Sequence, residues 1–70
     1  MNLPEKLARE IARVSELREQ YSLFRGQPNI NVEPAIFMMD DALEKAKQAA
    51  GSPDIEVQIS AIKDLEDFTD

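Results

Sequence analysis

A long apolar stripe in the first third of the chain constrains the fold more than any other feature. Its members recur at spacings of three and four residues, and they are Leu3, Leu7, Ile11, Val14, Leu17, Tyr21 and Phe24. This spacing places them on one face of an α-helix. Asn2 is a candidate N-cap with Glu5 three residues later, and Gly26 supplies a C-terminal stop. We therefore predict a first helix over about residues 3–25.

A second helical pattern follows a short irregular segment. Its apolar positions, at spacings of 3, 4, 3 and 4, are Ile36, Met39, Leu43, Ala46 and Ala50. Pro34 is suited to the first turn of a helix, so the pattern predicts a helix over about 34–50. Residues 26–33 show no periodicity and predict an ordered loop that tucks Ile30 and Val32 back onto the protein.

The third element has two overlapping patterns. One is a strand-like alternation over Ile55, Val57 and Ile59, and the other is a helical stripe over Ile55, Ile59, Ile62 and Leu65. Gly51, Ser52 and Pro53 resemble a C-cap, an N-cap and a first helical residue in turn. A lone strand would have no partner for its backbone groups. We therefore favour a tight connection and a third helix over about 53–68.

Together these elements predict an all-α bundle, with a long first helix and a tight helical hairpin in a single domain over residues 1–70. The chain has no cysteine and no histidine. Disulfides, zinc sites of the usual kind and Cys/His or Ser/His nucleophiles are therefore excluded. We expect no enzymatic activity, no cofactor and no metal. No apolar run approaches the ~18 residues of a membrane span, and the N-terminus lacks a signal pattern, so we expect a cytoplasmic protein away from membranes.

The net charge is −6, and the last 19 residues alone carry six acidic groups and one basic group. Nucleic-acid binding depends on clustered Lys and Arg, so this balance argues against it. Acidic side chains near a helix C-terminus oppose the helix dipole, which suggests a purpose other than helix stability. The segment over 64–70 also carries Leu65 and Phe68, and it suits docking to a basic, hydrophobic groove. Two alternatives are a solubilising tail and a mimic of nucleic acid.

The strongest indication of a binding role is an excess of apolar residues. Residues 35–39 are all apolar, and at about 100° per residue they encircle the helix, so Phe37 points away from the core stripe. Val57, Ala61 and Phe68 fall on the side of the third helix away from its stripe. The predicted partner-binding residues are Phe37, Met38, Asp41, Val57, Ala61, Leu65 and Phe68. The alternative is that the 26–33 loop or the first helix covers Phe37.

Adjacent Asp40 and Asp41, with Glu44 nearby, raise the question of paired carboxylates or a hard-metal site. Neighbouring residues on a helix point about 100° apart, so the two aspartates do not converge. We interpret this group as a solvated acidic face.

Two charges interrupt the first stripe and suggest a second copy of the chain. Glu10 and Arg18 lie about 12 Å apart along a helix, too far to pair easily with each other. An antiparallel homodimer centred on Val14 would pair them between chains. The predicted dimer residues are Leu7, Glu10, Ile11, Val14, Leu17, Arg18 and Tyr21. The alternative is a monomer in which Lys6 and Arg13 hold Glu10 while Arg18 reaches water.

The run Asn-Val-Glu-Pro-Ala-Ile-Phe-Met-Met-Asp-Asp-Ala-Leu over 31–43, with the break at 49–52, resembles segments of short uncharacterised proteins from proteobacteria and their phages or prophages. The resemblance implies an accessory role, such as inhibiting or redirecting a host protein. From the residues, we expect a small acidic module that binds and regulates another protein. The alternatives are an acidic DNA mimic, which needs carboxylates at phosphate-like spacing, and a helical bundle that encloses a small ligand.

Overall fold

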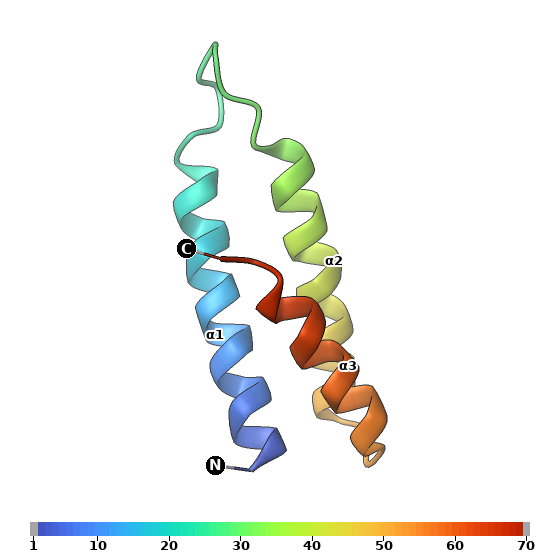
Figure 1. Cartoon of the computed structure of the whole chain (residues 1–70). Helices are drawn as coiled ribbons and strands as arrows, with labels where there is room; N and C mark the ends of the chain where they lie inside the picture. Colours follow the sequence, from blue (N-terminus) through green and yellow to red (C-terminus); the bar gives the residue numbers. More distant parts are fainter. Residues whose placement is uncertain (1, 70) are drawn as a thin grey trace.

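The computed structural model describes residues 2–69 and shows an all-α fold, as the sequence predicts. The three helices are α1 (Leu3–Ser22), α2 (Glu33–Ala50) and α3 (Ile55–Glu66). In Figure 1, α1 and α2 lie side by side along the length of an elongated molecule, and the shorter α3 packs across one part of the pair. The molecule measures 44 × 19 × 16 Å along its principal axes.

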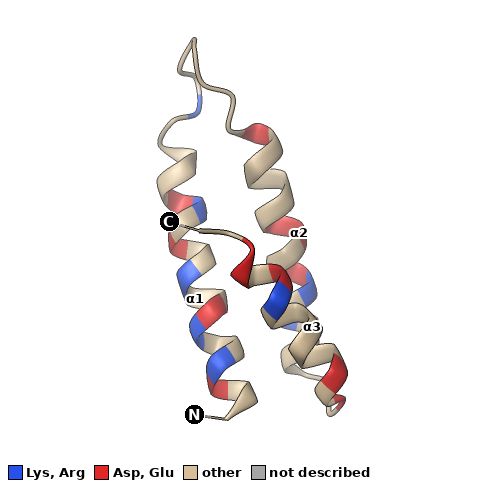
Figure 2. Ribbon diagram, in the orientation of Figure 1, with Lys and Arg blue, Asp and Glu red and all other residues tan. Residues whose placement is uncertain are grey.

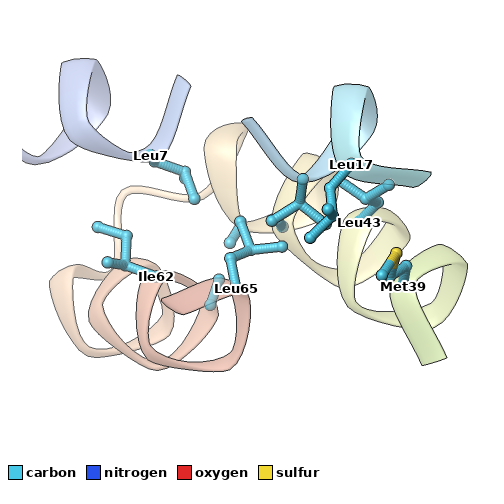
Figure 3. Packing of buried hydrophobic residues seen from close by; sticks show 10 residues of the cluster. Leu7, Leu17, Met39, Leu43, Ile62 and Leu65 are labelled. Atoms are coloured by element: carbon cyan, nitrogen blue, oxygen red, sulfur yellow. The ribbon is translucent and has the colours of Figure 1, made fainter. Parts of the chain in front are cut away.

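The core lies where all three helices meet. Its buried apolar residues are Leu7, Val14, Leu17, Met39, Leu43, Ala46, Ala49, Ala61, Ile62 and Leu65. Figure 3 shows Leu65 of α3 between Leu7 and the Leu17/Leu43 pair of α1 and α2, with Ile62 beside Leu7. Every helix therefore buries a stripe, and burial of these stripes is the main force that holds the bundle together.

The N-terminus of α1 is capped as predicted, but its C-terminus lies earlier than predicted. The Asn2 side chain accepts a hydrogen bond of 2.9 Å from the Glu5 N–H. The helix ends at Ser22, not near residue 25, because the next N–H groups donate to carbonyls three residues back instead of four. Gly26 then reverses the chain with a φ of +86°, a conformation that favours glycine.

The connection between α2 and α3 differs from the prediction at its N-cap. Asp54, not Ser52, caps α3, and its carboxylate accepts a 3.0 Å hydrogen bond from the Glu56 N–H. Ser52 instead accepts a 3.1 Å bond from the Asp54 N–H through its hydroxyl. The Gln58 side chain, which is buried, donates a 2.8 Å bond to the Ser52 carbonyl. The connection is therefore fixed by polar contacts that apolar periodicity does not reveal.

The face that α3 buries matches the predicted one only in part. Ile55 and Ile59 are exposed by 60% and 39%, whereas Gln58 and Ala61 are buried. Ile62 and Leu65 of the predicted stripe are buried, so the stripe is correct in its second half and the helix is rotated away from Ile55 and Ile59 in its first half. The small Ala61 side chain and the bond from Gln58 to the connection favour the observed rotation.

The length of α3 divides the molecule into two parts. Its 12 residues span about 18 Å, against about 30 Å for the 20 residues of α1. Arg13 donates to the Leu65 carbonyl at 2.9 Å and Lys45 bonds Asp64 at 2.7 Å, so the end of α3 lies level with these residues. Beyond this level, α1 and α2 continue without a third helix (Figure 1). We call residues 18–40 the hairpin end and the rest the three-helix part.

A candidate docking surface at the hairpin end

Large apolar side chains are concentrated on the surface of the hairpin end. The structure describes eight such exposed side chains among residues 2–69, and five belong to this part, namely Leu23, Phe24, Ile30, Phe37 and Met38. The remaining three lie on α3 at the opposite end of the molecule. Phe24 and Ile30 line one hollow of the loop, whereas Phe37 and Met38 lie on two different sides of α2. Exposed apolar side chains gathered at one end of a small protein suggest an interaction site.

Phe37 is the most exposed aromatic side chain of this surface, at 74%. Its neighbours on α2, Ile36 and Met39, are almost fully buried at 1% each. Neither the loop nor α1 covers Phe37, so that alternative is wrong, and Phe37 points away from the core as the sequence predicts. Met38 is exposed by 60% on a third side of the helix, because consecutive residues turn by about 100°.

The loop after α1 forms an apolar hollow with the helix ends. Tyr21, Phe24, Ile30 and Val32 line it, and its volume is about 170 Å³. Val32 is tucked in and buried as predicted, but Ile30 remains 47% exposed at the rim. The hollow therefore adds apolar contact surface to the hairpin end.

Two ion pairs neutralise much of the charge at the hairpin end. In each pair an arginine of α1 or the following loop contacts a carboxylate of α2. Arg25 bonds Glu33 at 2.7 Å, and the Arg18 guanidinium donates to both carboxylate oxygens of Asp40. The hydrogen bond to Asp40, with the attraction of its charge, raises the pKa of Arg18. The loop over 26–32 carries no charged residue, and Figure 2 shows most charged positions elsewhere on the helices.

The carboxylates that follow Phe37 along α2 differ in their pairing. Asp40 pairs with Arg18, whereas Asp41 and Glu44 have no side-chain partner within the described part of the chain. Asp41 is exposed, and it lies one turn from Phe37 on the same face. An exposed aromatic ring and unpaired carboxylates therefore share the outer face of α2.

The residues predicted to form a homodimer are placed mainly inside the single chain. Leu7, Val14 and Leu17 belong to the core, with Ile11 and Tyr21 packed against it. Val14 is fully buried, so it cannot lie on a two-fold axis between two α1 helices. That interface is wrong, because α2 and α3 already cover the stripe.

The two charges that suggested the dimer also find partners within the chain. Glu10 pairs with Arg13 at 2.9 Å, as the monomer alternative predicts. Arg18 pairs with Asp40 and does not extend freely into water. Neither charge requires a second copy.

The predicted second face of α3 is also wrong in part. Ala61 and Leu65 are both 0% exposed, so they belong to the core and not to an outer surface. Phe68, beyond the end of α3, is partly buried and packs against the core. Val57 remains 40% exposed. Of the seven predicted partner-binding residues, Phe37, Met38 and Asp41 form an exposed group on α2, and Val57 lies apart from them.

Several surface residues of the hairpin end were missed by the sequence reasoning. Leu23 is 78% exposed and Phe24 46% exposed, although Phe24 continues the α1 stripe in the sequence. The change follows from the early end of α1 at Ser22, which the glycine and proline that follow indicate only approximately.

Within residues 2–69, no group of three or more acidic, histidine or cysteine residues is arranged to hold a metal ion. Across the same residues, no helix combines the length and the apolar character needed to cross a membrane. Comparisons with protein-family models, curated proteins and solved structures found no match to this chain. The placement of the residues themselves therefore carries the functional argument.

Proposed function

We propose that this chain is a small acidic protein-binding module that regulates or inhibits a partner protein, and that it docks through the hairpin end. The observation that carries the proposal is the group of exposed apolar side chains there, above all Phe37 at 74% exposure. Removing apolar surface from water contributes about 25 cal/mol per Å², so a partner that covers these side chains gains binding free energy.

The apolar character of these exposed side chains is not explained by a role in folding. The three-helix part already buries a continuous core with contributions from α1, α2 and α3. Phe37 and Leu23 add little to that core, because most of their surface remains in water. Aromatic and methionine side chains such as Phe37 and Met38 are typical of adaptable protein interfaces. Their positions therefore support a role in binding.

The two alternative functions have less support. A nucleic-acid mimic needs a long row of free carboxylates, but Glu33 and Asp40 on α2 are paired with arginines, which leaves Asp41 and Glu44 as the free carboxylates of that helix. A small-ligand site usually encloses about 300–1,000 Å³. The apolar hollow at the hairpin end holds only about 170 Å³. A groove between α1 and α2 holds about 460 Å³, but it is open to solvent and its lining is mostly charged, so it does not enclose an apolar ligand. A macromolecular partner fits the exposed surface better.

Binding by a module of this size is best suited to regulating the partner protein. The module is small and carries a net charge of −6, and one end of it is apolar. The resemblance of residues 31–43 to short proteobacterial and phage proteins adds an accessory role, in which the module inhibits or redirects a host protein.

A comparative pull-down tests the proposal. Wild type, Phe37→Asp and the matched control Val57→Asp are immobilised and exposed to the same bacterial lysate, after circular dichroism has established that all three are folded. We expect a specific protein to be retained by wild type and Val57→Asp and lost by Phe37→Asp. Equal retention by all three variants would contradict docking at the hairpin end.

A further inference from the structure

We propose that the segment recognised by the module is a basic amphipathic helix, which lies along the outer face of α2 with its apolar side on Phe37 and its cationic side chains on Asp41 and Glu44. This inference rests on the proposed function and names the chemistry of the partner.

The three residues form one line along the surface of α2, which begins at Phe37 in the hairpin end and continues with Asp41 and Glu44 into the three-helix part. Asp41 and Glu44 follow Phe37 by four and seven residues, a spacing that keeps them on one helix face over about 10 Å. All three are exposed, and the two carboxylates have no side-chain partner among residues 2–69. The line therefore offers one apolar anchor followed by two available negative charges.

One unpaired carboxylate lies beside Phe37 on the helix surface. Asp41 follows Phe37 by one turn, whereas Glu33 and Asp40, about one turn before and after it, already pair with Arg25 and Arg18. An aromatic face attracts a Lys or Arg cation within about 6 Å of the ring, and nearby carboxylates strengthen that attraction. The surroundings of Phe37 therefore favour a partner that brings cations together with apolar groups.

A groove between α1 and α2 extends this face. Its volume is about 460 Å³, and its lining is Ser15, Arg18, Glu19, Asp40, Leu43, Glu44 and Lys47. Together with Asp41, the groove carries four acidic and two basic side chains. This excess of negative charge matches a basic partner. A second copy would bring the same negative face and a chain charge of −6, so it is disfavoured here.

The fold also favours a helical partner over an extended one. A segment that binds by β-strand addition needs a sheet edge, and the described residues form helices and turns without a strand. A helix satisfies its own backbone and packs into the groove between two helices at interaxial distances of 8–10 Å. The geometry thus matches an amphipathic helix in a helical groove.

Fluorescence anisotropy with designed peptides tests the chemistry. Three peptides of about 18 residues, each ~27 Å long as a helix, share one leucine stripe and carry Arg, Gln or Glu on their polar face. We expect the Arg peptide to bind at least about tenfold more tightly than the Gln peptide at low salt, and the Glu peptide to bind least. Salt should weaken the Arg peptide most, because it screens exposed charges.

Matched variants locate the contact. Asp41→Asn with Glu44→Gln should weaken the Arg peptide by about tenfold, since each exposed charge pair contributes modestly. Glu56→Gln with Glu66→Gln removes the same charge from unpaired positions on α3 and should have a much smaller effect. Equal weakening by both pairs would show attraction to net charge only and would overturn the proposed site.

Two further outcomes separate this inference from the function on which it rests. If the Gln peptide binds as tightly as the Arg peptide and Phe37→Ala weakens both, the basic partner is wrong while docking at the hairpin end stands. If sedimentation shows a wild-type dimer that Phe37→Asp dissociates, a second copy is the occupant and the inference is overturned. Failure of the lysate comparison would count against the proposed function itself.

Discussion

The two parts of this molecule are built from the same two helices, yet they treat apolar side chains differently. In the three-helix part, α3 places Ala61, Ile62 and Leu65 over the α1 and α2 pair. At the hairpin end no third helix is present. Met38 lies on the side of α2 that carries Lys45, whose partner Asp64 belongs to α3, and Met38 remains 60% exposed. Two packed helices can bury only the faces they turn toward each other. Apolar content alone therefore does not decide burial, because the third helix must be present to complete it.

The α2 helix shows this contrast within one element. Ile36, Met39 and Leu43 on its inner face are at most 5% exposed, whereas Phe37 and Met38 on its other sides are at least 60% exposed. The first group supports the fold and the second is available for binding. Substitutions in the two groups should therefore have effects of different size and kind.

The largest loss of stability is expected at Leu65, which is 0% exposed where α3 meets the other helices. Leu65→Ala should lower the free energy of unfolding by about 2–5 kcal/mol, through lost burial and the cavity that remains. Urea denaturation followed by circular dichroism measures this change. A loss below about 0.5 kcal/mol would show that α3 does not complete the core.

A smaller loss is expected at Phe68, which packs on the core beyond the end of α3 but is only partly buried. Phe68→Ala should cost about 1–3 kcal/mol, less than a fully buried phenylalanine, because part of the ring already contacts water. The same urea measurement checks it. If the free energy of unfolding did not change, Phe68 would be a surface residue, as the sequence predicts.

The N-cap of α3 should contribute less again. Asp54→Ala should cost about 1 kcal/mol, since its carboxylate accepts a hydrogen bond from the Glu56 N–H. Ser52→Ala removes only the hydroxyl contact to the Asp54 N–H and should cost less. Thermal denaturation of the two variants gives the ranking. The reverse order would indicate that α3 begins at the serine.

Much of the fold follows from the sequence, because the periodic stripes of α1 and α2 fit only helices of about the observed lengths. The exposure of Phe37 also follows, since five consecutive apolar residues cannot all face one core. The rotation of α3 does not follow. It depends on the buried Gln58, whose bond to the Ser52 carbonyl joins residues that no apolar pattern links.

The candidate site was partly misplaced for a related reason. The apolar stripe of α1 predicts that this face is covered. In the structure α2 and α3 of the same chain cover it, and not the α1 helix of a second copy. A periodic stripe states that a face is buried, but it does not identify what covers it. The pairing of Arg18 with Asp40, 22 residues away, likewise depends on the packing of α1 against α2.

The separation of a folding core from a docking end is tested by measuring stability and binding together on the purified Phe37→Ala variant. Phe37 is 74% exposed, so its loss should change the free energy of unfolding by no more than about 0.5 kcal/mol. The same variant should bind the Arg peptide at least about tenfold more weakly than wild type, because the apolar anchor is gone. A loss of several kcal/mol in urea, with peptide binding unchanged, would contradict the separation of a folding core from a docking end.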